Sequence, residues 1–306
     1  MSRGWVFGVI AGVGVLSAAA GAYQAQQQAA PKVVEVEKLK DNLYMLKGGG
    51  GNTAVFVAST GVVVVDTKNP GWGQPILDKI KEITDKPVTT IVNTHTHGDH
   101  VSGNVEFPAT VDVVVQENTK TNMDKMMSPP GFNAPGGPTI FQQSNGKGLP
   151  KRTFKDKMTI GKGADEVDLY YFGRGHTNGD AFVVFPALRV MHAGDIFSGK
   201  NLPLLDTNNG GSGVEIGETL GKAHAGIKNV DAVITGHSTV MTWADLGEYA
   251  QFNKDLASDV QAGVKAGKTP DEIAAASKIA DKYKGYNIAE ARLKANVASI
   301  AGEIKK

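Results

Sequence analysis

The sequence contains, at positions 95–100, the stretch His95-Thr96-His97-Gly98-Asp99-His100, which places four potential metal ligands within six residues. It directly follows residues 89–93, Thr-Thr-Ile-Val-Asn, a run that is typical of a strand. Imidazole and carboxylate groups are ligands that zinc and similar divalent ions accept, and a His-x-His pair on an extended turn can direct two ring nitrogens at one ion. A single histidine is more often a core or surface residue, but such a dense cluster favours a metal site.

Three later segments repeat one pattern, in which a candidate ligand follows glycine just after an apolar run. These segments are Gly175-His176, Gly194-Asp195 and Gly236-His237. In α/β proteins the ends of strands converge on one edge of a sheet, where ligand-binding loops gather. The three segments and the 95–100 cluster therefore predict one shared site.

The candidate ligands are too many for one tetrahedral zinc ion and match two ions that share a ligand. They are His95, His97, Asp99, His100, His176, Asp195 and His237. Their order, His-x-His-x-Asp-His followed by His, Asp and His, resembles the metallo-β-lactamase superfamily. The resemblance extends from about Val33 to Trp243 and implies an α+β fold, a four-layer αββα sandwich with a binuclear site along one edge.

The resemblance also implies a role for each ligand. The first ion would be held by His95, His97 and His176, and the second by Asp99, His100 and His237. Asp195 would bridge the two ions, as in the glyoxalase II, lactonase and phosphodiesterase-like branches, whereas the dedicated lactamases have a cysteine here. Two divalent ions, with zinc expected, would provide a bridging hydroxide that attacks a carbonyl or phosphorus. Asp99 would orient this hydroxide and is the candidate catalytic residue.

Three other residues near these segments need an interpretation. Asp66 ends the apolar run 61–65 and is a candidate for fixing the orientation of a ligand imidazole, although a turn or helix-capping role is an equal alternative. His192 precedes Asp195, but we expect it not to be a ligand because the set is complete without it. His224 is expected on a helix face, without a functional role.

The N-terminus has the pattern of a secretory signal peptide, which we predict at residues 1–22. One cation, Arg3, precedes an apolar stretch, and Ala20 and Ala22 satisfy a small-residue cleavage rule. Residues 23–31 are expected to be a flexible segment. The protein is thus predicted to be exported to the periplasm or secreted, with an uncleaved membrane anchor as the alternative; we expect no stable membrane span after cleavage.

The remaining residues, 32–306, are long enough for one large domain, with C-terminal helices from about Trp243. The sequence has no cysteine and a formal net charge of +1, so there is neither a disulfide nor an electrostatic reason to expect nucleic acid as a partner. Two long loops, at 128–150 and 197–213, are candidates for contacting a small-molecule substrate. Because they are mostly apolar or amide-containing, we expect an uncharged or weakly charged substrate. The oligomeric state is not predicted.

The coarse pattern predicts short strands on both sides of the ligand cluster. Among them are residues 62–66 and a single strand at Thr153–Ile160. The glycine tract 48–51 is predicted to be a flexible hairpin-like loop, and Thr269-Pro270 to begin a helix.

The function expected from these features is that of an exported binuclear hydrolase acting on an ester, lactone, thioester or amide. Two alternatives remain open at this point. One is a β-lactamase of weak activity, and the other is an iron-dependent sulfur or oxygen oxidoreductase of the same fold.

Overall fold

The computed structural model describes residues 32–132 and 136–305. The predicted signal peptide at residues 1–22 and the segment at 23–31 lie outside the described residues. From Val33 onward the chain forms one compact unit. Within the described part, none of the helices is both long and apolar enough to cross a membrane.

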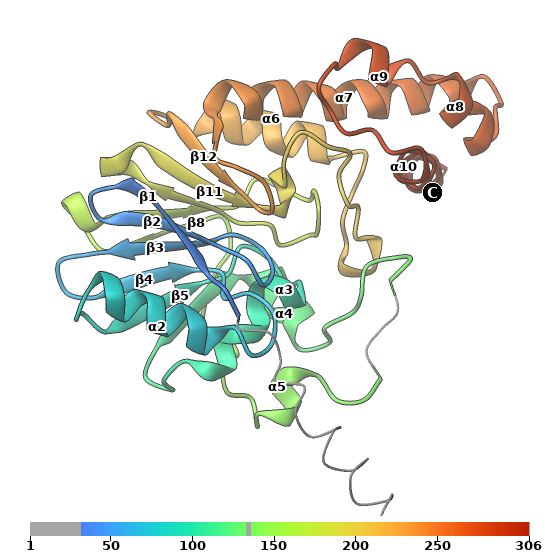
Figure 1. Cartoon of the computed structure of the whole chain (residues 1–306). Helices are drawn as coiled ribbons and strands as arrows, with labels where there is room; N and C mark the ends of the chain where they lie inside the picture. Colours follow the sequence, from blue (N-terminus) through green and yellow to red (C-terminus); the bar gives the residue numbers. More distant parts are fainter. Residues whose placement is uncertain (1–31, 133–135, 306) are drawn as a thin grey trace, which may run out of the picture. The chain divides into compact units, whose positions relative to one another are not determined.

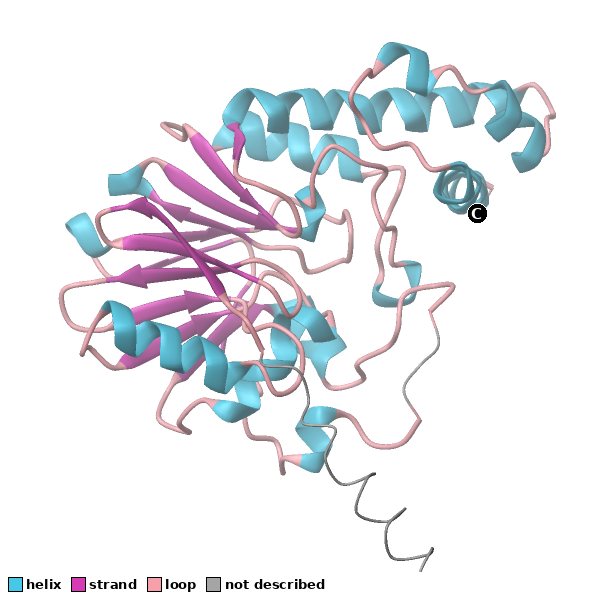
Figure 2. Cartoon of the chain, in the orientation of Figure 1, coloured by secondary structure: helices cyan, strands magenta, loops and turns pink. Residues whose placement is uncertain are grey.

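Two sheets form the centre of this unit (Figure 2). In the first sheet the strands are neighbours in chain order, antiparallel from β1 to β4 and parallel from β4 to β7. Its strands are β1 (Glu35–Lys40), β2 (Leu43–Lys47), β3 (Thr53–Val57), β4 (Val62–Val65), β5 (Val88–Val92), β6 (Asp112–Gln116) and β7 (Arg152–Phe154).

The second sheet has the order β13-β12-β11-β10-β9-β8 and is antiparallel except for the parallel pair β11 and β12. Its strands are β8 (Lys157–Ile160), β9 (Val167–Tyr170), β10 (Phe182–Phe185), β11 (Val190–Gly194), β12 (Ala232–Thr235) and β13 (Met241–Thr242).

Helices cover the outer faces of both sheets (Figure 1). Helix α2 lies on the first sheet, and α6 and α7 lie on the second. The described helices are α2 (Gly73–Ile83), α3 (Gly98–Val101), α4 (Glu117–Met123), α5 (Ile140–Gln143), α6 (Ile216–Gly226), α7 (Trp243–Lys265), α8 (Pro270–Ala276), α9 (Ile279–Lys282) and α10 (Glu290–Ile304). Helix α8 begins as predicted, with Thr269 as its cap and Pro270 in its first turn.

Three hydrophobic cores hold the layers together. The four valines of β4 contribute side chains to two of these cores. Side chains alternate between the faces of a strand. Val63 and Val65 accordingly pack between the sheets, whereas Val62 and Val64 pack against the helices of the first sheet. All four are buried, which explains why this strand is continuously apolar. The predicted αββα sandwich is confirmed.

One predicted strand is wrong. Residues Thr153–Ile160 do not form a single strand but belong to β7 and β8, which lie in different sheets. The chain turns between them, where the Asp156 carbonyl accepts a hydrogen bond from the Tyr171 amide at 2.9 Å. Apolar and polar residues alternate on both sides of the turn, so the sequence pattern does not show that the chain moves from one sheet to the other.

Candidate metal centre

All seven predicted ligands lie in segments that follow strands, with Asp99 and His100 in the short helix α3, and these segments meet in one place. The 95–100 cluster follows β5, and the other three ligands, His176, Asp195 and His237, come after β9, β11 and β12. Among the described residues, three groups of side chains are close enough to hold an ion, and two of these groups consist of predicted ligands alone. One contains His95, His97, His176 and Asp195, and the other contains Asp99, His100 and His237.

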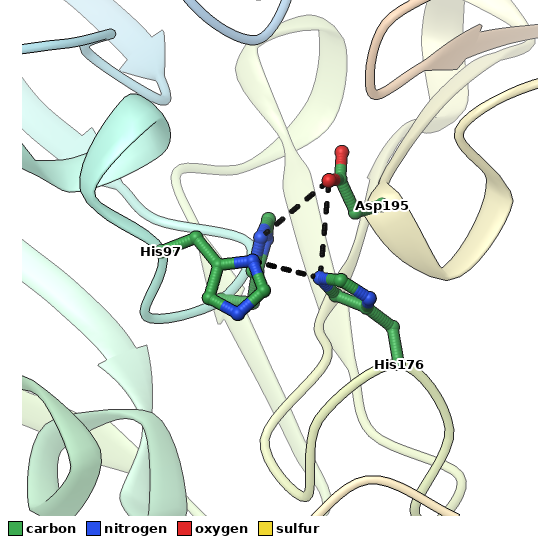
Figure 3. Close-up of side chains that lie close together, drawn as sticks. His97, His176 and Asp195 are labelled. Carbon is green, nitrogen blue, oxygen red and sulfur yellow. Dashed lines mark hydrogen bonds and ion pairs between the residues drawn. The ribbon is translucent and has the colours of Figure 1, made fainter. Parts of the chain in front are cut away.

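In the first group every donor atom lies within 4.8 Å of the others. His97 Nδ1 is 3.0 Å from His176 Nε2, and Asp195 Oδ2 is 3.8 Å from the same nitrogen (Figure 3). Asp195 Oδ2 is also 4.0 Å from His95 Nε2. A tetrahedral ion about 2.0–2.2 Å from each ligand would separate the ligand atoms by about 3.3–3.6 Å. The separations of 3.0, 3.8 and 4.0 Å lie close to this range, so small shifts of the side chains would bring the four donors to one such ion.

In the second group, His237 Nε2 lies 3.2 Å from Asp99 Oδ2, and His100 Nε2 lies 3.7 Å from the same oxygen. The Asp195 carboxylate reaches this group as well, with Oδ1 at 3.2 Å from His100 Nε2 and Oδ2 at 3.3 Å from His237 Nε2. One carboxylate thus faces both groups, which is the arrangement of a ligand shared by two ions.

His95 provides a direct test of whether a cation fits. Its Nε2 is buried and makes no hydrogen bond within the described residues, and such a buried, unsatisfied nitrogen is costly without a partner. Burial, together with the imidazoles of His100 and His176, holds the pKa of His95 well below its usual range. The ring is therefore neutral, as metal ligation requires, and its free nitrogen points into the first group.

The carboxylates of the centre stay ionised. Burial raises the pKa of Asp99, but contacts with His100 and His237 outweigh burial and bring this pKa to about 2. The same two imidazoles hold the pKa of Asp195 well below its usual range despite burial. In the opposite direction, Asp195 and Asp99 raise the pKa of His237 to about 9, although burial lowers it. A divalent cation can supply the positive charge that these carboxylates need, with release of the imidazole protons.

In His95, His97, His100 and His176, the ring nitrogen that faces away from the centre has a hydrogen-bond partner. Such contacts fix the orientation of a ligand ring. His100 Nδ1 lies 2.7 Å from Asp66 Oδ2, so the predicted role of Asp66 in orienting a ring agrees with the geometry. His97 Nε2 lies 2.7 Å from Asp206 Oδ2, and His176 Nδ1 donates to the Leu204 carbonyl at 2.6 Å. Sequence reasoning missed Asp206, because it stands in a loop without a strand before it.

The two histidines that were not predicted as ligands lie outside both groups. His192 is buried between main-chain groups, with Nε2 at 3.0 Å from the Asn52 carbonyl and Nδ1 accepting from the Gly194 amide. His224 lies on α6 and stacks on Trp243, with ring centroids 4.8 Å apart. His224 thus lies on a helix, as predicted.

Lys68 is a second residue that sequence reasoning missed. Its side chain is fully buried, and its Nζ donates to the carbonyls of Leu46 and Gly51 at 2.8 and 2.7 Å. Burial lowers the pKa of Lys68 to about 7. These bonds hold the glycine tract 48–51, the turn between β2 and β3, against the second group of ligands. The tract was predicted to be flexible, but its glycines are needed for close packing, since a Cβ on Gly51 would lie 2.1 Å from the His100 ring.

A cavity of about 1150 Å³ adjoins the centre and is lined by His97, Asp99, Asp195 and His237. Both loops predicted to contact the substrate contribute to its wall, with Phe132 and Ile140 from the first among the lining residues. The second loop contributes Ser198, Asn201, Leu202 and Leu204. These four candidate ligands are thus accessible to a small molecule.

Comparison with known proteins places this geometry in a family. The family model described as "Metallo-beta-lactamase superfamily" matches residues 46–237. The chain is 29% identical over 251 residues to a metallo-beta-lactamase type 2 of Elizabethkingia meningoseptica, a match that covers 76% of this chain and 88% of the relative. It is 25% identical over 172 residues to a hydroxyacylglutathione hydrolase of Nostoc punctiforme, covering 56% and 54% of the two chains.

Solved structures agree in fold. A stereoselective inverting sec-alkylsulfatase from Pseudomonas sp. has a TM-score of 0.68 and 15% identity, covering 89% of this chain but only 50% of the sulfatase. A metallo-beta-lactamase from Pontibacter korlensis has a TM-score of 0.58 and 20% identity, covering 72% of this chain and 99% of that one. Since the family model matches more than half of the sequence and includes every candidate ligand, the chain belongs to the metallo-β-lactamase superfamily and is a metal-dependent hydrolase of it.

Proposed function

We propose that the protein is an exported binuclear hydrolase that cleaves an ester, lactone, thioester or amide bond in a small organic molecule. The main support is the Asp195 carboxylate, which faces both groups of candidate ligands beside a cavity. The catalytic domain would comprise residues 32–306, and the predicted signal peptide at 1–22 would direct it to the periplasm or outside the cell.

In this proposal the seven candidate ligands hold two ions. The first ion would be bound by His95, His97 and His176, and the second ion by Asp99, His100 and His237. Asp195 would be a ligand of both ions. Nitrogen and carboxylate donors of this kind suit zinc. When bound, such ions lower the pKa of water and polarise a carbonyl oxygen, which makes a nucleophile available near neutral pH.

The chain itself would orient the reacting groups. Asp99 lines the cavity, is only half-buried and remains ionised, so that its oxygen can accept a hydrogen bond from water and transfer the proton to the leaving group. Asp66 and Asp206 would keep the rings of His100 and His97 in place during turnover. No serine or cysteine nucleophile is required.

Metal content tests the ligand assignment. We expect the purified chain, loaded with zinc and then dialysed, to carry close to two ions, as measured by elemental analysis. Asp195→Ala should lower the content of both sites because Asp195 contributes to both. A content of one ion or none in the wild-type protein would contradict the shared-carboxylate arrangement.

A substrate panel tests the reaction class. The zinc-loaded protein should hydrolyse an activated ester, a lactone or a thioester faster than a phosphodiester or a β-lactam. Its relatives include a hydroxyacylglutathione hydrolase and a metallo-beta-lactamase, and we expect weak β-lactam hydrolysis since the shared ligand is an aspartate. Oxygen consumption by the iron-loaded protein, without hydrolysis, would instead favour an oxidoreductase.

A further inference from the structure

The charged side chains in the cavity wall are unevenly distributed. The acidic residues of the lining are Asp99 and Asp195, which both belong to the candidate metal centre. Two cations, Lys125 and Arg292, also line the cavity. Lys125 is exposed, whereas Arg292 is half-buried. Arg292 is therefore the cation that is more withdrawn from solvent.

Arg292 differs from the other arginines of the described residues in having no carboxylate partner. Arg152 pairs with Asp112 at 2.8 Å, and Arg174 pairs with Glu215 at 2.6 Å. Arg189 pairs with Asp231, also at 2.6 Å. Within residues 32–132 and 136–305, Arg292 forms neither an ion pair nor a hydrogen bond. A planar guanidinium with all its donors free suits a carboxylate or another oxyanion.

The position of Arg292 is fixed relative to the metal centre. It lies in the first turn of α10, and the segment before this helix is joined to the loop that follows Asp195. Asn287 forms a bridge with Asn201, and its amide donates to the Lys200 carbonyl at 2.9 Å. Within α10, Asn296 Nδ2 donates to the Pro203 carbonyl at 3.1 Å. The same loop thus anchors both a candidate ligand and the helix that carries Arg292.

The cavity wall also has an apolar part. Met127 and Phe132 are 44% and 57% exposed, and both belong to the lining. Exposed large apolar side chains that gather at one cavity are typical of a binding surface. A fitting ligand would therefore have an apolar body as well as a group for Arg292.

We infer that Arg292 binds an anionic group of the substrate, with a carboxylate as the simplest example, while the apolar body of the same molecule contacts Met127 and Phe132. This inference rests on the proposed hydrolase function and specifies its substrate class. The family model does not assign this residue, because it ends at residue 237. The two loops led us to expect an uncharged or weakly charged substrate. The inference departs from the uncharged alternative, because Arg292 comes from a helix outside these loops.

Two esters of equal chain length test the inference. Mono-4-nitrophenyl suberate ends in a carboxylate, and 4-nitrophenyl octanoate ends in a methyl group. The zinc-loaded wild type should have the lower KM for the suberate. In Arg292→Met, the ratio of the suberate KM to the octanoate KM should rise about tenfold, because one charge-assisted contact is lost. Arg292→Lys should recover part of the preference.

The control is Lys294→Met, on the same helix. Lys294 pairs with Glu290 and does not line the cavity, so this variant should keep the wild-type KM ratio. An unchanged ratio in Arg292→Met, or an equal change in Lys294→Met, would overturn the inference. A change in Lys125→Met but not in Arg292→Met would likewise overturn it and assign the anion to Lys125.

Direct binding separates this inference from the proposed hydrolase function. If the wild type hydrolyses neither ester, the proposed function fails for esters, but binding of suberanilic acid can still be measured by calorimetry. Arg292→Met should bind this carboxylate about tenfold more weakly than the wild type and Lys294→Met. Equal binding by all three proteins would show that the carboxylate binds elsewhere.

Discussion

Replacement of Asp99 by alanine is expected to lower kcat/KM for an activated ester by about a thousandfold or more. In the proposed function Asp99 is both a ligand and the acceptor that orients the attacking water. Its Oδ2 lies 3.2 Å from His237 Nε2, and Asp99 lines the cavity. Alanine removes the ligand, the proton acceptor and one negative charge at the same time.

Asp99→Asn and His224→Ala complete the experiment. Asparagine keeps the shape of Asp99 without its charge, so a similar loss of activity would identify the carboxylate as the essential feature. His224 stacks on Trp243 outside the centre, and its replacement should leave kcat/KM within about twofold of the wild type. Equal losses in Asp99→Ala and His224→Ala would contradict the role given to Asp99.

The candidate ligands could be found from the sequence because their positions follow a local rule. A ligand-type residue after an apolar run predicts a side chain at a strand end, and the sheet then brings such ends together. His176 and Asp195, nineteen positions apart, come within 3.8 Å of each other in this way. The sequence does not reveal this distance or the division of the ligands into two groups. The positions of the ligands just after predicted strands are nevertheless enough to predict that they share one edge of the sheets.

The side chains that support the ligands could not be found in this way. Asp206 contacts His97 from a loop that is ordered by its own hydrogen bonds, since its Oδ1 accepts from the amides of Asn208 and Asn209. Lys68 is a residue type that is almost never fully buried without a partner, and its partners are main-chain carbonyls that no side-chain pattern reveals. Such contacts depend on tertiary structure rather than on periodicity.

The fold could be predicted where burial produces a strong hydrophobic pattern in the sequence. It could not be predicted where the chain passes from one sheet to the other. The run 62–65 is buried on both faces, and its continuous valines correctly predict a strand. The stretch 153–160 has the composition of one strand but contains the passage from β7 to β8. A turn of two ordinary residues, without glycine or proline, gives no local signal of such a passage.

Gly51→Ala is expected to have the second large effect, because the glycine tract is packed rather than loose. A Cβ at this position would lie 2.1 Å from His100 Cε1 and 2.5 Å from its Nε2. The ring cannot retreat easily, since its Nδ1 is held by Asp66 and its side chain is fully buried. The backbone cannot retreat either, because the Gly51 amide donates to the Asp99 carbonyl and its own carbonyl accepts from Lys68.

The expected result of Gly51→Ala is the loss of the second ion, with metal content falling from about two per chain toward one and with ester hydrolysis falling in parallel. Overpacking should also lower the free energy of unfolding by about 1–3 kcal/mol. Gly302→Ala is the matched control, because Gly302 lies in α10 with no atom near its Cβ position, and alanine there should be neutral or slightly stabilising. Since Gly51 does not have a left-handed backbone, the clash with His100 is the sole reason to expect a loss. Retention of two ions and full activity in Gly51→Ala would therefore show that His100 does not hold the second ion in the orientation described.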